Sequence, residues 1–145
     1  MLRDLALVVL VFLILAFTSF IEAPPSYLPA QIENLSISPQ GGVVTLKTQK
    51  GHLPIYISYT QAIGLRDALN RTRHFRPTTH DIAAELAKYA KAKALYITKL
   101  VNGTYYAELE TSYGKIDIRP SDGLIICTKV KCPIYVNPLL IEFTK

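Results

Sequence analysis

The dipeptide Asn102-Gly103 is the feature that most restricts the fold of this chain. It separates two strand-like runs, residues 95–101 and 104–111, which are rich in aromatic and β-branched residues. Asn-Gly is the preferred pair for a two-residue hairpin turn, because both positions of that turn need a positive φ. We therefore predict an antiparallel hairpin here, which favours an α+β fold over a doubly wound parallel sheet.

Shorter signals predict the remaining strands. Val43–Leu46 and Leu53–Ile57 are β-rich runs on either side of a turn region at Lys50-Gly51, so we expect a second hairpin. Further short strands are expected at 115–118 and 134–136, the last one followed by a polar tail.

Apolar residues at helical spacing predict about three helices. The first should run from Thr60 to near Asn70, and the third should be the nearly all-apolar segment Leu124–Val130, with Ser121 as its N-cap. In the second helix, Thr78 and Asp81 have the spacing of a capping box. The stripe that follows is expected to be buried and consists of Ile82, Leu86 and Tyr89.

One compact domain accounts for these elements. The chain has 145 residues, 50% of them hydrophobic, which is enough for one core but hardly for two. We predict a single α+β domain of mixed β-sheet and about three helices over residues 41–145.

A charge-free run occupies residues 5–21. Its roughly 17 residues lie at the short end of what spans a bilayer. A signal peptidase site is poorly matched, because Pro24 directly follows the best candidate at Ala23. We therefore expect residues 1–22 to be an uncleaved transmembrane helix, and residues 23–40, which contain four prolines, to be an extended stalk.

Basic residues near this run indicate its orientation. Arg3 and the amino terminus precede it, and no Lys or Arg follows until Lys47. Because basic residues stay on the cytoplasmic side, we expect a single-pass anchor with the domain outside the cytoplasm.

The predicted domain is basic. Without Arg3, Asp4 and Glu22, the chain keeps 15 basic and 9 acidic residues, a formal charge of +6. Such an excess favours anionic partners such as nucleic acid or acidic head groups. The positive charge is concentrated in one window, which consists of Arg66, Arg71, Arg73, His74 and Arg76. This window is either a solvated helix end and loop or a surface that binds successive phosphates.

The two cysteines, Cys127 and Cys132, do not have the spacing of a CxxC redox or zinc pair. Both flank apolar residues, so we expect them to pack as small hydrophobic side chains.

Five short motifs, taken in order, resemble the bifunctional nuclease (BFN) domain family, also called DUF151. The resemblance covers about residues 41–142, and its motifs are Leu53–Ile57, Arg76–Asp81, Asn102–Ala107, Asp117–Asp122 and Cys132–Val136. It implies a compact α+β domain, often dimeric, with an activity against DNA and RNA in some members. The site residues that it implies are His80, Asp81, Arg119, Ser121 and Asp122.

The chain departs from the family pattern at three positions. Gln61 stands where a glutamate is usual, Gly123 replaces an alanine, and Lys131 replaces a glycine. Loss of a carboxylate at position 61 would remove a metal ligand or a general base.

The implied residues suit phosphodiester hydrolysis. His80 is a candidate base, Asp81 and Asp122 are candidate ligands of a divalent metal ion, and Arg119 is a candidate phosphate clamp. A structural alternative stays open, because Ser121, Asp122 and Asp81 also suit helix caps and first turns.

The leading hypothesis is a membrane-anchored, BFN-like nuclease of low sequence specificity, acting on DNA, RNA or both. The alternative is a non-catalytic anion- or protein-binding domain, regulatory and dimeric, held at the membrane. Five tyrosines could stack on bases, although tyrosines on strands more often serve packing: Tyr56, Tyr59, Tyr105, Tyr106 and Tyr113.

We predict that the full chain stays in the membrane fraction after alkaline carbonate extraction, because residues 5–21 carry no charge. The measurement is an immunoblot of pellet and supernatant with amino-terminal sequencing of any soluble form. A soluble protein that starts near Pro24 would instead show cleavage.

Overall fold

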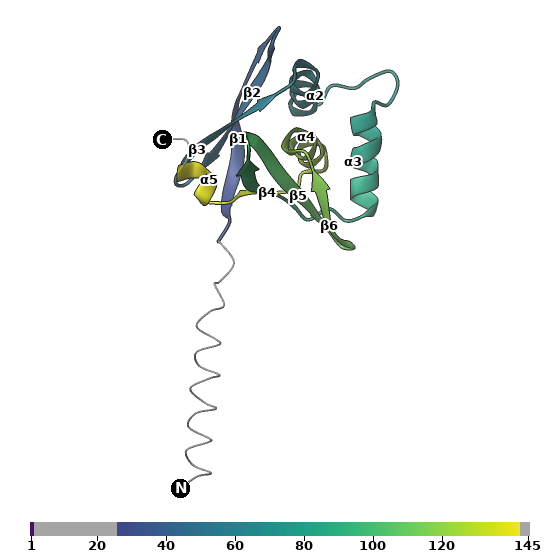
Figure 1. The fold of residues 1–145 in the computed structure, drawn as a ribbon. Coiled ribbons are helices and arrows are strands. Elements are labelled where there is room, and N and C mark those ends of the chain that lie inside the picture. Colours follow the sequence, from purple (N-terminus) through teal and green to yellow (C-terminus); the bar gives the residue numbers. More distant parts are fainter. Residues whose placement is uncertain (2–25, 143–145) are drawn as a thin grey trace.

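The computed structural model describes Met1 and residues 26–142 (Figure 1). The predicted anchor at 5–21 lies outside these residues. Within the described part, no helix is both long enough and apolar enough to span a bilayer.

A seven-stranded mixed sheet forms the frame of the described domain, in the order β3-β2-β1-β7-β4-β5-β6. Neighbouring strands are antiparallel except β4 and β7, which are parallel. The predicted α+β class with a mixed sheet is therefore confirmed. The strands are β1 (Leu28–Ser38), β2 (Gly41–Thr48), β3 (Gly51–Ile57), β4 (Ala94–Val101), β5 (Thr104–Thr111), β6 (Gly114–Ile118) and β7 (Ile134–Val136).

Both predicted hairpins are confirmed. In the β4–β5 pair, Val101 lies opposite Thr104, and Asn102 and Gly103 have φ values of 48° and 77°, as the turn requires. In the β2–β3 pair, Thr48 lies opposite Gly51.

The prediction of a stalk up to residue 40 is wrong, because residues 28–38 form β1. This strand lies inside the sheet, where it pairs with β2 on one side and β7 on the other. Its inward-facing residues change phase where the register shifts between Ile32 and Asn34. Such a bulge breaks the simple alternation that identifies a strand, and the domain therefore begins before Gly41.

The helices are α2 (Tyr59–Leu69), α3 (Thr79–Tyr89), α4 (Pro120–Val130) and α5 (Leu139–Glu142). The first three lie on one side of the sheet (Figure 1). The segment expected to be a polar tail contains α5 instead, and its Leu140 and Ile141 are buried.

Helix α4 is the most buried helix of the described domain. Leu124 and Ile125 are fully buried, and the helix contacts α2, α3, β4 and β5. A Cβ atom on Gly123 would lie 2.4 Å from Cδ1 of Leu95 on β4. The glycine that replaces the family's usual alanine therefore lets α4 approach the sheet closely.

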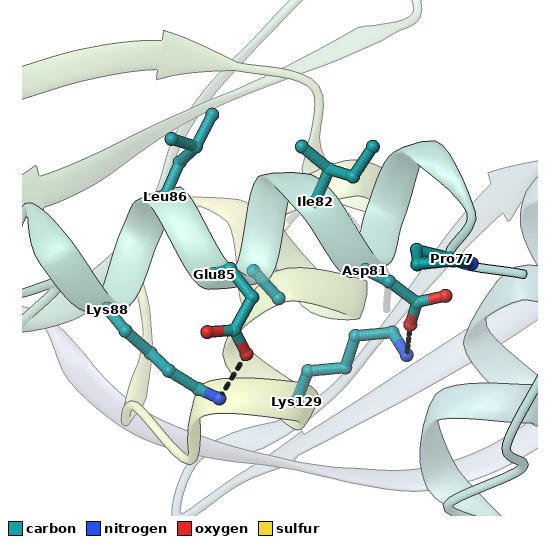
Figure 2. A pocket seen from close by; sticks show the side chains of 8 residues that line it. Pro77, Asp81, Ile82, Glu85, Leu86, Lys88 and Lys129 are labelled. Carbon is teal, nitrogen blue, oxygen red and sulfur yellow. Dashed lines mark hydrogen bonds and ion pairs between the residues drawn. The ribbon is translucent and has the colours of Figure 1, made fainter.

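The stripe that we expected to bury α3 is exposed. Ile82, Leu86 and Tyr89 are 55%, 63% and 79% exposed, and Figure 2 shows the first two pointing away from the helix. The buried residues are Ala84 and Ala87. Because small residues let two helices come close, α3 packs through its alanines against α4.

The capping box predicted at the start of α3 is confirmed. The backbone N–H of Thr78 donates to Asp81 Oδ2 over 2.7 Å. The other carboxylate oxygen accepts from Lys129 Nζ on α4 over 2.7 Å (Figure 2). Lys129 and the N–H of Thr78 hold the pKa of the Asp81 carboxyl well below its usual range.

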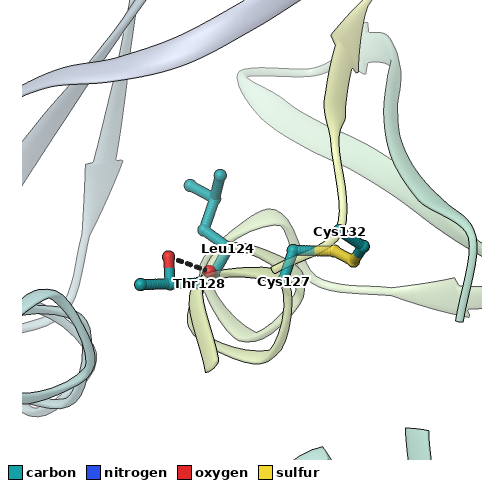
Figure 3. The surroundings of a disulfide bond; sticks show 4 residues. All are labelled: Leu124, Cys127, Thr128 and Cys132. Carbon is teal, nitrogen blue, oxygen red and sulfur yellow. Dashed lines mark hydrogen bonds between the residues drawn. A yellow bond between two sulfur atoms is a disulfide. The ribbon is translucent and has the colours of Figure 1, made fainter. Parts of the chain in front are cut away.

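Cys127 and Cys132 form a disulfide, so the expectation that they pack as separate hydrophobic side chains is wrong (Figure 3). Between them, Lys131 adopts φ 62°, and the N–H of Cys132 donates to the Cys127 carbonyl over 3.1 Å. This left-handed end to α4 turns the chain back and brings the two Cα atoms to 4.7 Å, within disulfide range.

We predict that reducing the disulfide lowers the melting temperature. Closing a short loop restricts the unfolded chain, which contributes roughly 2 kcal/mol to stability. Thermal denaturation with and without a phosphine reductant measures this effect. The Cys127→Ser/Cys132→Ser variant is the control and should melt like the reduced protein with or without reductant. Equal melting temperatures for the oxidised and reduced protein would contradict the prediction.

We predict that Asp81→Asn destabilises the domain by about 1 kcal/mol at pH 7, because it removes a cap and a partner of Lys129. A carboxyl with a lowered folded-state pKa stabilises the fold above its unfolded pKa, about 4, and this contribution is lost as pH falls below that value. The difference in melting temperature from the wild type should therefore shrink between pH 4 and pH 2. Glu85→Gln, which breaks only the exposed pair with Lys88, should have little effect at either pH.

Candidate active site

The starts of α3 and α4 meet at a contact between His80 and Asp122. Nε2 of His80 lies 3.2 Å from Oδ1 of Asp122, which is in the first turn of α4. A Cβ atom on Gly64 of α2 would lie 3.5 Å from two atoms of the His80 ring. The imidazole therefore packs against α2 at this glycine, at a distance that is ordinary van der Waals contact.

Arg119 completes a three-residue cluster. Its Nε donates to Oδ2 of Asp122 over 2.7 Å, while the side chain as a whole is mostly exposed. The Asp122 carboxylate thus bridges an imidazole and a guanidinium, and the exposed guanidinium keeps further N–H groups for another acceptor. The structure brings together three of the five implied site residues: His80, Arg119 and Asp122.

Asp81 lies apart from this cluster although it follows His80 in sequence. Successive residues of a helix point in different directions, so His80 contacts the start of α4 and Asp81 contacts Lys129 near its end. With both oxygens bonded to Thr78 and Lys129, Asp81 has the structural role that capping predicts.

Ser121 does not cap α4, contrary to our prediction. The N-cap is Arg119, which makes no side-chain capping bond, and Pro120 is the first helical residue. Proline suits that position because its missing N–H would have no helical partner. The helix thus starts before Ser121, whose side chain becomes buried in the first turn at 4% exposure.

Gln61, where the family usually has a glutamate, forms a capping box at the start of α2. Its Oε1 accepts from the N–H of Ser58 over 3.0 Å, and its own N–H donates to the Ser58 hydroxyl over 3.3 Å. The spacing Ser58-x-x-Gln61 could have revealed this role from sequence.

A cavity of about 320 Å³ lies beside Arg119. It is formed by the end of β3, the start of α2, the β4–β5 turn and the start of α4. Its lining includes Tyr56, Gln61, Tyr105, Arg119 and Ser121. Sequence reasoning treated the two tyrosines as packing residues and did not place them here.

The basic window lies mainly in the loop between α2 and α3. Arg71, Arg73 and Arg76 are exposed there. Asp67 is paired with Arg66 over 3.0 Å and with His74 over 3.3 Å. The loop arginines therefore present positive charge to solvent on the side of α3 where His80 begins the helix.

Among the described residues, no three His, Cys, Asp or Glu side chains gather closely enough to hold a metal ion together. The site consequently offers at most His80 and Asp122 as neighbouring ligand types, and not a closed protein cage for a metal.

Comparison with known proteins identifies the family. A family model described as the bifunctional nuclease domain matches residues 44–145. Bifunctional nuclease 1 of Oryza sativa subsp. japonica is 33% identical over 107 residues, which cover 65% of this chain and 32% of that protein. Bifunctional nuclease 1 of Arabidopsis thaliana is 28% identical over 131 residues, covering 76% of this chain and 40% of the relative.

A bacterial relative is also similar. An uncharacterised protein of Mycobacterium tuberculosis (strain ATCC 25618 / H37Rv) is 34% identical over 100 residues, or 66% of this chain and 61% of that protein. This chain thus matches less than two thirds of the length of each of the three relatives. The family match spans most of the chain and confirms the resemblance drawn from its motifs, so the chain belongs to the bifunctional nuclease domain family.

Proposed function

We propose that this domain is a nuclease that hydrolyses phosphodiester bonds of DNA, RNA or both, with low sequence specificity. The observation that carries the proposal is the cluster of His80, Asp122 and Arg119 at the starts of two helices. The names of the plant relatives, bifunctional nucleases, support the same activity.

Each member of the cluster has a chemical role in this proposal. His80 is the general base that accepts a proton from the attacking water, and its contact with Asp122 orients the imidazole. Arg119 binds the phosphate oxygens, where charge accumulates in the transition state. Asp122 positions both side chains, and the helix starts add a favourable field for an anion.

A divalent metal ion is part of the proposal in a limited way. Mg²⁺ is often bound by only one or two protein carboxylates together with substrate phosphates. Asp122 is the candidate carboxylate, since it lies in the cluster beside the phosphate-binding Arg119, whereas Asp81 lies apart and is held by Lys129. Such an ion would supply positive charge to the phosphate oxygens.

We also propose that residues 5–21 hold the domain at a membrane, outside the cytoplasm, and that the domain is a homodimer. The disulfide of Cys127 and Cys132 supports an oxidising compartment. The exposed apolar residues of α3 (Ile82, Leu86 and Tyr89) form a surface that a second copy would cover.

A second candidate function is a non-catalytic domain that binds an anion or a protein. The observation that favours it is Gln61, because an amide replaces the family's usual carboxylate and its oxygen serves the cap of α2. An amide cannot act as a general base at neutral pH.

We predict that the purified full chain cleaves single-stranded nucleic acid in the presence of a divalent metal ion. His80→Ala and Asp122→Asn should each reduce the rate by about a hundredfold or more, as expected for losing a base or the residue that positions it. A gel assay with a labelled oligonucleotide measures the rate. Melting curves are needed because Asp122→Asn also removes a first-turn charge worth roughly 0.3–1 kcal/mol.

Gln61→Glu separates the two candidate functions. Glutamate also fits the third position of a capping box, so the fold should be unaffected. A nuclease weakened by the amide should become faster, whereas a binding domain should gain no activity. If the wild type and this variant are both inert with several metals while the folded protein binds nucleic acid, the binding function replaces the nuclease.

A further inference from the structure

The cavity beside Arg119 has a polar end at the start of α4. Ser121 lines it and is only 4% exposed, yet its hydroxyl has no hydrogen bond within the part of the chain that the structure describes. Every fully buried side-chain nitrogen or oxygen among those residues has a partner. The unpartnered Ser121 hydroxyl is therefore not fully buried, and the cavity that Ser121 lines is the space beside it.

Two backbone N–H groups at the same place also have no hydrogen-bond acceptor among residues 26–142. The N–H of Gly123 donates to the Arg119 carbonyl over 3.0 Å, so the helical bonds of α4 begin there. The N–H groups of Ser121 and Asp122 precede that bond, and no side chain caps them. Capping boxes serve this purpose in α2 and α3.

These donors belong to residues 119–122 at the start of α4, and as a group they suit a phosphate. The Ser121 hydroxyl, the first-turn N–H groups and the exposed guanidinium of Arg119 all donate hydrogen bonds. An anion at such a helix start is stabilised by both hydrogen bonds and the helix dipole.

Two tyrosines are among the other residues that line the cavity. Tyr56 is 80% exposed at the end of β3 and lines the cavity together with Tyr105. An exposed tyrosine ring beside a phosphate site is an arrangement that binds nucleic acid bases by stacking. The volume of about 320 Å³ is at the small end of ligand sites and suits one nucleotide rather than a base pair.

We propose that this cavity binds one unpaired nucleotide, with its phosphate against Ser121 and the α4 start and its base against Tyr56. This inference rests on the proposed nuclease function, because it takes nucleic acid as the substrate. The nucleotide in the cavity is the part of that substrate next to the His80 cluster. A base in a paired duplex has neither face free, so the cavity selects single-stranded substrate.

The test is isothermal titration calorimetry of the full chain in detergent. The ligands are adenosine 5′-monophosphate, uridine 5′-monophosphate and inorganic phosphate. Both nucleotides should bind about tenfold or more tightly than phosphate, because stacking adds to the phosphate contacts. Ser121→Ala should weaken all three ligands. Tyr56→Ala should weaken only the nucleotides, down to the level of phosphate.

Tyr113→Ala is the matched control, because Tyr113 is 85% exposed in the β5–β6 turn and does not line the cavity. It should leave all affinities unchanged. Nucleotide binding that equals phosphate binding, or that is insensitive to Ser121→Ala in a protein with a wild-type melting curve, would overturn the inference.

The cavity inference and the proposed nuclease function can fail independently of each other. A protein that cleaves nucleic acid but binds nucleotides without need of Ser121 or Tyr56 would refute the cavity alone. A protein that binds nucleotides through these two residues but cleaves nothing would support the cavity and refute the nuclease.

Discussion

The burial of α4 against the sheet and two other helices is the contact on which the rest of the structure depends. A helix as apolar as Leu124–Val130, in which only Thr128 and Lys129 are polar, has to be covered on several sides. Two glycines allow this: Gly123 admits Leu95 of the sheet, and Gly64 admits Ile125 of α4. The candidate site follows from this packing, because α2 and α3 cover α4 with their starts close to its own.

Local signals predicted the parts of the fold that are decided locally. The Asn102-Gly103 hairpin and the Thr78–Asp81 capping box each depend on a few neighbouring residues, and both are present. The failures concern distant partners. The bulged β1 is recognisable only through its pairing with β2 and β7, and the buried face of α3 is set by how closely α4 approaches. A pattern of large apolar residues could not show that alanines would fill that contact.

In the candidate site, too, the residues could be predicted from the sequence, whereas their contacts depend on distant parts of the chain. The family resemblance identified His80 and Asp122 as candidate site residues. Because they are 42 positions apart in the sequence, only the folded structure shows that their side chains meet. The adjacent Asp81 could equally have been catalytic, and what separates the two is the direction in which consecutive helical residues point. Ser121 had the chemistry of an N-cap. With proline as the first helical residue, the helix starts two residues earlier than predicted, which turned an exposed cap into a buried hydroxyl.

The position of β1 also has a kinetic consequence. Leu28 pairs with Val136, so the two halves of the sheet are joined only when the first and last strands of the described domain meet. Loop closure over so long a separation is costly in entropy, and proteins built on such pairs fold slowly for their size. Until β7 arrives, one edge of β1 carries unpaired N–H and C=O groups that could recruit a foreign strand. Folding of this domain therefore passes through a stage at which aggregation competes with completion of the sheet.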